Sequence, residues 1–366
     1  MSLWFESRLA TLSSLLLLIF LVHPHSCKAV DLKPCGFQAI YNFGDSLSDT
    51  GNAMAEHPSP HAWHYPLGMT IGRATGRACD GLLIIDHIAE ATGLPFCNPY
   101  LNKSLDHSKG ANFAVGGTGL LSKEERAEWN VNFVWSNDSL DVQLRWFDQH
   151  LNDNFKDEKA RRDHLKSSLF VIGGGGNDYG AMGGSPLYDK LPYIEQKKLI
   201  MPVVVGALVD AVKKFISYGA NKVIATGVYQ GGCIGGCKVT DKGLHCWEPT
   251  NEFHKLHNEF LQRKLQELGK EYPDARFAYG DVWGGAQWIW DRYQSLGFVY
   301  PQKACCGDKD HMYCGMDGTP WCSNPNEHVF WDCPGHFTDK SYRYMYQQMI
   351  PRIVEELQCD DKKNEL

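Results

Sequence analysis

Apolar residues recur along the chain in two alternating patterns. Short unbroken runs rich in aliphatic and aromatic residues predict buried strands at residues 37–43, 111–115, 169–173, 222–228 and 275–282. Between these runs, apolar residues spaced three or four apart predict helices at residues 81–93, 139–151, 199–218, 250–272 and 338–357. Strands that are apolar on both faces and separated by helices predict a parallel sheet covered on both sides.

Three predicted strand ends carry sequences that are unusual for plain turns. They are "GDS" at residues 44–46, "AVGGTG" at 114–119 and "GGGGNDY" at 173–179. Ligands of open α/β folds bind outside the carboxyl ends of the strands, so these sequences are expected near one another. Glycine lets a backbone amide approach a ligand closely, and Asn177 could aim a side-chain amide at the same point. Such donors stabilise the oxyanion of acyl transfer, which makes Ser46 a candidate nucleophile.

A serine nucleophile needs a base, and fifteen histidines compete for that role. His336, in "FWDCPGHFTD", is the best placed, because it precedes the last predicted helix and follows Asp332 by four residues. A carboxylate can hold one imidazole nitrogen so that the other accepts the serine proton. Each of these sequence features alone is weak evidence for a catalytic site, and a glycine run by itself usually marks a tight turn. Their order along the chain, each at a strand end or loop, is what indicates a catalytic site.

The four blocks "FGDSLSDTGN", "GANFAVGGTG", "GGGGNDY" and "FWDCPGHFTD" resemble those of the plant-type GDSL esterase/lipases, within the SGNH hydrolase superfamily. The segment "ATGRACDGLLIIDHIAEATGLP" is also similar to the family, and the resemblance extends from about residue 37 to 357. It implies an α/β fold, a three-layer α/β/α sandwich with a flavodoxin-like five-stranded parallel sheet.

The resemblance also implies a role for each site residue. Ser46 is the expected nucleophile, His336 the general base and Asp332 the acid that orients it. The oxyanion donors are the Ser46 amide, Gly117 and Asn177, with the adjacent Gly116 as an alternative to Gly117. No cofactor or metal is implied.

Two features depart from the family pattern. Three residues, Cys333 to Gly335, separate Asp332 from His336 where the family has two, so either the loop bulges or another group orients the imidazole. The segment "GMTIGRA" at residues 68–74 replaces the usual aromatic and basic residues, which predicts an altered substrate entrance. The nearby "HPSPHAWHY", residues 57–65, is interpreted as a surface loop at the pocket mouth rather than as a metal site.

The N-terminus predicts a secreted protein. Arg8 and the apolar residues 15–22 indicate a signal peptide over residues 1–29, which leaves a single hydrolase domain over 30–366. The apolar stretch is too short to span a bilayer. Asn102 and Asn137 begin glycosylation sequons. The C-terminal "KNEL" differs by one residue from an endoplasmic-reticulum retention signal, but we interpret it as a charged tail.

Thirteen cysteines agree with secretion. Removal of Cys27 with the signal peptide leaves twelve, an even number suited to disulfides. Zinc sites could be drawn from Cys233, Cys237 and Cys246 with His245, or from the cysteines of residues 305–333, but disulfides explain the count more simply.

The overall charge limits the classes of molecule that the protein is expected to bind. A formal net charge of −7 without a basic block argues against a nucleic-acid partner. The sequence therefore predicts a secreted serine esterase or lipase that acts on a small-molecule, lipid or cell-wall ester. Two alternatives stay open: an acyltransferase with the same triad, and a catalytically impaired binding or defence protein on the same fold.

Overall fold

The predicted parallel sheet is present. The computed structural model describes residues 32–359 except 60, 130, 132–134, 183–189 and 240. Five parallel strands lie in the order β2-β1-β3-β4-β5, as expected for a flavodoxin-like sheet. Their bounds are β1 Ala39–Phe43, β2 Gly110–Asn112, β3 Ser168–Ile172, β4 Lys222–Thr226 and β5 Arg276–Gly280.

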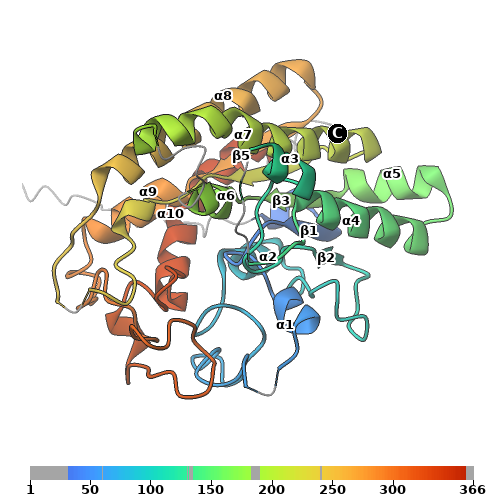
Figure 1. The fold of residues 1–366 in the computed structure, drawn as a ribbon. Coiled ribbons are helices and arrows are strands. Elements are labelled where there is room, and N and C mark those ends of the chain that lie inside the picture. Colours follow the sequence, from blue (N-terminus) through green and yellow to red (C-terminus); the bar gives the residue numbers. More distant parts are fainter. Residues whose placement is uncertain are drawn as a thin grey trace, which may run out of the picture. The chain divides into compact units, whose positions relative to one another are not determined.

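Helices lie between all successive strands and after the last one (Figure 1). They are α1 Asn52–Glu56, α2 Ile84–Thr92, α3 Lys123–Glu128, α4 Leu140–Asn154, α5 Glu158–Lys166, α6 Gly176–Ala181, α7 Tyr193–Tyr218, α8 Glu248–Glu271, α9 Val282–Trp290 and α10 Asp339–Leu357. The five helices predicted from apolar spacing are confirmed as α2, α4, α7, α8 and α10. The sequence did not predict α5, a largely polar helix capped by the Asp157 side chain, or α9, whose apolar residues surround the helix.

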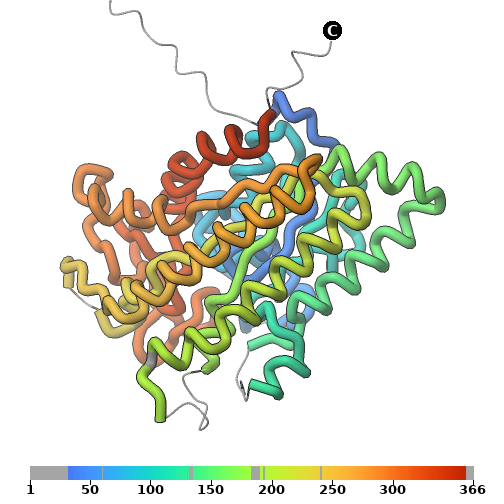
Figure 2. The backbone as a smooth tube through the Cα atoms, turned by 90° about the horizontal axis from the view of Figure 1, so that it is seen from above, coloured from blue at the N-terminus to red at the C-terminus, as the bar shows by residue number. Residues whose placement is uncertain are grey.

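The sheet separates two hydrophobic cores, which gives three layers. On one face, Tyr41, Phe43 and Phe170 pack with side chains of α4, α7 and α8. On the other face, Ile40, Val171 and similar strand residues pack with α2, α9 and α10. Figure 2 shows the long α7 and α8 running next to each other over the first face. Successive strand residues point to opposite faces, so strands whose apolar residues alternate between the two faces produce both cores.

Five disulfides link ten of the twelve cysteines in the described part of the chain. The pairs are Cys35–Cys359, Cys233–Cys246, Cys237–Cys333, Cys305–Cys322 and Cys306–Cys314. The expectation that all twelve suit disulfides is wrong for Cys79 and Cys97, which are buried thiols packed against backbone carbonyls. The cysteines considered for zinc instead bond to one another.

The histidine loop of residues 57–65 lies against the disulfide-linked segment 305–322 (Figure 1). Asp317 accepts hydrogen bonds from both His61 Nδ1 at 2.6 Å and His64 Nε2 at 3.0 Å. Leu67, which follows this loop, packs with Cys305, Cys306 and Trp331 in a small separate core.

Within the described ranges, no group of side chains is arranged to hold a metal ion and no helix is long and apolar enough to cross a membrane.

Candidate active site

Ser46 lies on a tight turn directly after β1, at the carboxyl end of the sheet. The turn begins at Gly44, whose φ of 147° favours glycine, and a Cβ there would stand 2.7 Å from the Gly173 carbonyl oxygen. Asp45 supports the turn, because its Oδ1 accepts the Leu47 amide at 3.0 Å. The half-buried Ser46 side chain is thereby presented above the strand ends.

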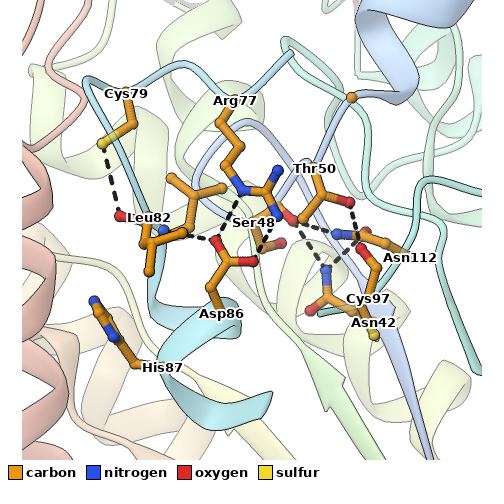
Figure 3. A network of polar contacts seen from close by, with 12 residues as sticks. Asn42, Ser48, Thr50, Arg77, Cys79, Leu82, Asp86, His87, Cys97 and Asn112 are labelled. Carbon is orange, nitrogen blue, oxygen red and sulfur yellow. Dashed lines mark hydrogen bonds and ion pairs between the residues drawn. The ribbon is translucent and has the colours of Figure 1, made fainter. Parts of the chain in front are cut away.

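Two buried asparagines anchor the turn from below, and neither was predicted to do so. Asn42 and Asn112 are paired across β1 and β2, and both side chains donate to the Ser48 carbonyl, at 3.2 and 2.6 Å. Figure 3 shows this contact beside the buried ion pair in which Arg77 donates to both oxygens of Asp86, at 2.8 and 2.6 Å. That ion pair fixes the start of α2, since Asp86 also accepts the Leu83 amide.

Gln143 of α4 holds the other end of the turn. Its Oε1 accepts the Gly44 amide and its Nε2 donates to the Gly44 carbonyl, both at 2.9 Å. The same amide nitrogen donates to the Asp138 carbonyl at 3.0 Å. A polar residue on the buried face of α4 was the only sequence signal for this role, because Gln143 falls between the apolar Leu140 and Phe147.

The structure brings the three expected triad residues together. His336 Nε2 lies 2.7 Å from Ser46 Oγ, and His336 Nδ1 lies 2.6 Å from Asp332 Oδ2. A serine hydroxyl, an imidazole and a carboxylate in one hydrogen-bonded chain is the arrangement in which a serine can be deprotonated as it attacks.

The extra residue between Asp332 and His336 is absorbed by a compact turn. Gly335 has a φ of 102°, and the amides of Gly335 and His336 both donate to Asp332 Oδ1, at 3.2 and 3.0 Å. The loop therefore bulges, which is the first of the two outcomes considered from the sequence. The turn is further held by the Cys237–Cys333 disulfide and by Tyr229, whose hydroxyl donates to the Gly335 carbonyl at 2.9 Å.

The surroundings of His336 favour its protonated form. Burial lowers the pKa of His336, but the charge of Asp332, the hydrogen bond that His336 donates to Asp332 and the charge of Asp45 together raise the pKa above 6.5. Asp45 is itself buried, and this burial raises the pKa of its carboxyl group. The imidazole is thus suited to accept a proton, and its base form requires a pH above this raised value.

The two glycine-rich loops, residues 114–119 and 173–179, adjoin the Ser46 turn and offer different hydrogen-bond donors to a substrate. The Gly116 amide donates to Asp49 Oδ2 at 2.8 Å, and a Cβ on Gly116 would lie 3.7 Å from Ser46 Cβ. This bond occupies the Gly116 N–H, which favours Gly117 as the oxyanion donor. Asn177, at the start of α6, uses one side-chain hydrogen to donate to the Thr118 carbonyl at 2.7 Å, which leaves a second hydrogen for a substrate.

Two buried carboxylates brace these loops. Asp49 also accepts the amides of Gly51, Asn52 and Ala53, so it joins the block containing Ser46 to the block containing Gly116. Asp178 accepts the amides of Leu120 and Leu121, and burial raises the pKa of Asp178 to about 6. The bond between Asp49 and Gly116 was not predicted from the sequence.

Comparison with known proteins identifies the family. The sequence model of the GDSL-like lipase/acylhydrolase family matches residues 40–349. The chain belongs to this family. It is 33% identical to acetylajmalan esterase 2 of Rauvolfia serpentina, over 89% of this chain and 92% of that protein. A GDSL esterase/lipase of Arabidopsis thaliana is 34% identical over 89% and 93%. Sinapine esterase of Brassica napus is 32% identical over 84% of each chain.

These relationships give the enzyme class. Relatives that match most of both chains are named esterases, so this GDSL protein is a carboxylic ester hydrolase. A solved GDSL-like lipase from Parabacteroides merdae covers 90% of this chain and 99% of its own at 12% identity, with a TM-score of 0.37. The fold assignment accordingly rests on the five-stranded sheet and on the family match.

The remaining predicted features are two glycosylation sequons and the two ends of the chain. Asn102 is half-buried, and its side chain accepts a hydrogen bond from Ser104 Oγ at 2.7 Å, while Asn137 is exposed. Glycosylation at both stays a prediction. The signal peptide (residues 1–29) and the C-terminal "KNEL" lie outside the described residues.

Proposed function

We propose that this GDSL protein is a secreted serine esterase that hydrolyses esters through an acyl-enzyme on Ser46. The observation that carries the proposal is the continuous chain of contacts from Ser46 Oγ to His336 Nε2 at 2.7 Å and from His336 Nδ1 to Asp332 at 2.6 Å. The ten cysteines in disulfides support secretion, because such bonds persist in oxidising compartments.

The proposed reaction has two halves. Ser46 Oγ attacks the ester carbonyl carbon while His336 Nε2 takes the serine proton, and Asp332 stabilises the imidazolium that results. The carbonyl oxygen becomes an oxyanion, which the amides of Ser46 and Gly117 and the Asn177 side chain receive. The carbon–oxygen bond to the alcohol then breaks, and His336 returns the proton to the leaving oxygen. Water repeats the sequence on the acyl-enzyme, which releases the acid and frees Ser46.

The direct test compares wild type with Ser46→Ala on short-chain nitrophenyl esters. We expect wild type to hydrolyse them and the variant to lose at least about 10³-fold in kcat, since removing a triad nucleophile costs this much or more. Circular dichroism of both proteins controls for folding. A Ser46→Ala variant that keeps the wild-type rate would contradict the assignment.

The same site could pass the acyl group to an alcohol instead of water. Product analysis with an added alcohol acceptor separates the two reactions: the proposal predicts free acid as the main product, and a dominant new ester would favour the acyltransferase. The catalytically impaired alternative rested on the altered Asp332–His336 spacing, and the 2.6 Å contact supports the active enzyme over this alternative.

We further propose a small-molecule ester as the substrate. Two relatives carry names that refer to small-molecule esters, acetylajmalan and sinapine, and the family as a whole acts on acyl groups.

Expression of the full chain in a secreting eukaryotic host tests whether the protein is secreted. We expect enzyme in the medium with an N-terminus near residue 30, and intracellular retention of the uncleaved chain would contradict secretion.

A further inference from the structure

A row of three polar side chains lies on the buried face of α8, among the apolar residues that pack on the sheet. Asn251, His254 and Asn258 follow one another at spacings of three and four residues, which places them on one side of the helix. Their exposed fractions are 7%, 9% and 4%. Buried polar groups are nearly always hydrogen-bonded, so these side chains must have partners that an apolar core does not supply.

The partner of this polar row is the backbone of the loop that follows β4. Asn258 Oδ1 accepts the Val228 amide at 2.8 Å, and its Nδ2 donates to the Val228 carbonyl at 2.7 Å. His254 Nδ1 lies 2.7 Å from the Tyr229 carbonyl oxygen. Asn251 Oδ1 likewise accepts a loop amide at 3.0 Å. Three side chains of one helix therefore fix the path of this loop.

The bond from His254 requires one particular form of its ring. Burial lowers the pKa of His254 to about 4, so the imidazole is neutral at neutral pH and carries a single ring proton. Because a carbonyl oxygen only accepts hydrogen bonds, that proton lies on Nδ1, and His254 donates to Tyr229. The bond is therefore present throughout the neutral pH range.

Tyr229 connects this loop to the catalytic base. Its hydroxyl donates to the Gly335 carbonyl at 2.9 Å, and its ring meets Phe337 edge-to-face with centroids 4.8 Å apart. These two contacts lie directly before and directly after His336 in the chain. Burial, together with two nearby carboxylates, raises the pKa of Tyr229, so the phenol stays protonated and acts as a donor.

We propose that Tyr229 is a positioning residue for the general base His336, and that the polar row of α8 holds Tyr229 in place for this role. The inference rests on the proposed function, because the position of His336 affects a rate only if Ser46 is the nucleophile. Gly335 has a positive φ and is conformationally permissive, so the turn needs bonds from outside to keep one shape. A displacement of a reacting group by on the order of 1 Å can reduce a rate by about 10²-fold.

The test is Tyr229→Phe, which keeps the ring against Phe337 and removes only the hydroxyl. We expect kcat on nitrophenyl esters to fall by about 5- to 50-fold while KM stays within about 2-fold of wild type. The hydroxyl binds the turn and not the substrate, so only the chemical step should suffer. Rates are expressed per folded enzyme, with the folded fraction taken from circular dichroism.

Tyr218→Phe is the matched control. Tyr218 is also half-buried and its hydroxyl also donates at 2.9 Å, but to Asp148. Tyr218 ends α7, just before the amino end of β4, whereas the candidate active site lies at the carboxyl ends of the strands. The control should therefore keep the wild-type kcat.

A second pair of variants tests the contribution of α8. His254→Leu removes the donor to Tyr229, whereas His254→Asn offers an amide hydrogen close to the place of Nδ1. We expect the leucine variant to lower kcat by about 2- to 10-fold and the asparagine variant to recover most of the rate. Equal rates in the two variants would show that α8 does not act through this bond.

The proton between His336 Nδ1 and Asp332 gives a readout that does not depend on turnover. A contact of 2.6 Å should place its NMR resonance far downfield, where its loss in Asp332→Asn assigns it. We expect Tyr229→Phe to shift or broaden this resonance, because the imidazole changes its position relative to the carboxylate. Tyr218→Phe should leave the resonance unchanged.

The outcomes separate this inference from the proposed function. If either the kcat or the resonance of Tyr229→Phe is that of wild type, or if Tyr218→Phe changes both equally, the positioning role is refuted and the serine esterase stands. If wild type hydrolyses no ester, the proposed function fails, and the positioning role in catalysis fails with it.

Discussion

The two sides of the candidate active site are held by different forces. The nucleophile side comprises residues 41–52, 110–119 and 173–178, at the ends of strands. It is fixed by hydrogen bonds that buried Gln143 and Asn112 donate and that buried Asp49 accepts. The base side, residues 229–246 and 305–336, lies in loops and contains four of the five disulfides. These loops do not pair with a sheet. Disulfides stabilise their folded form instead, because the cross-links reduce the conformational freedom of the unfolded chain.

This contrast shows how one site can be assembled from a rigid scaffold and a tethered loop. The nucleophile turn inherits its position from β1, whose neighbours β2 and β3 fix it on both sides. The Asp332–His336 turn must be brought across to Ser46, 290 residues away in sequence. We expect changes on the two sides to damage catalysis and stability in different proportions, and the variants below test that expectation.

The largest effect is expected from Asp332→Asn on the base side. The amide cannot stabilise the imidazolium or hold the required tautomer, so kcat should fall by about 10⁴-fold, as for the equivalent change in a serine protease triad. Steady-state kinetics measures the loss, and Asp310→Asn, an exposed acid on the same side, serves as the control that keeps its rate. A loss below tenfold would show that another group orients His336.

On the nucleophile side, Gln143→Met should weaken folding and catalysis together. The change leaves the buried Gly44 amide without a partner, at about 1–3 kcal/mol, while the Gly44 carbonyl still accepts the Val115 amide at 3.1 Å. We expect urea unfolding to show a loss of about 1–3 kcal/mol, with kcat reduced at least tenfold. Gln149→Met on the exposed face of α4 is the matched control. Full activity in a destabilised Gln143→Met protein would mean that Gly44 does not set the position of Ser46.

On the base side, loss of a disulfide should separate activity from stability. Replacing Cys237 and Cys333 by serine frees the residue next to Asp332, and we expect kcat to fall by about tenfold. Replacing Cys35 and Cys359 by serine removes a cross-link near the amino end of β1, remote from the strand ends that carry Ser46. It should cost about 2–5 kcal/mol of unfolding free energy while the rate at 20 °C stays near wild type. Equal effects of both pairs on kcat would refute the proposed difference between the sides.

The smallest expected effect concerns pH. His336 must be neutral to act as base, so kcat/KM should fall as pH drops through its pKa, and the charges of Asp332 and Asp45 place this midpoint above 6.5. Asp45→Asn removes one of these charges while an oxygen remains for the Leu47 amide. The acid limb of the pH–rate profile should therefore move to lower pH. A limb that stays in place, or moves to higher pH, would contradict the assigned role of Asp45.

The same contrast explains what the sequence could predict. Apolar runs and helical spacing were sufficient for all five strands, their parallel order and the loops that carry Ser46 and Asn177. Gln143 escaped notice because one polar residue on a buried helix face does not reveal its partner.

Less of the base side could be predicted from sequence patterns. Its loops have no hydrophobic period, disulfide pairs cannot be assigned from spacing, and two cysteines expected to pair are buried thiols. Asp332 and His336 were selected by their place just before the last predicted helix, and the resemblance to a family block implied their roles. Whether Asp332 could reach His336 depended on the positive φ of Gly335 and on two backbone amides that converge on one carboxylate oxygen, and both are properties of the folded loop.

The most direct test of the central claim is to map the site that a fluorophosphonate labels in the intact enzyme. Peptide mass spectrometry should find one adduct, on Ser46, and the labelling rate should drop sharply in both His336→Ala and Asp332→Asn while their circular dichroism stays that of wild type. An adduct on a different residue, or labelling of Ser46 at the wild-type rate without His336, would contradict the proposal that these three residues work as a catalytic triad.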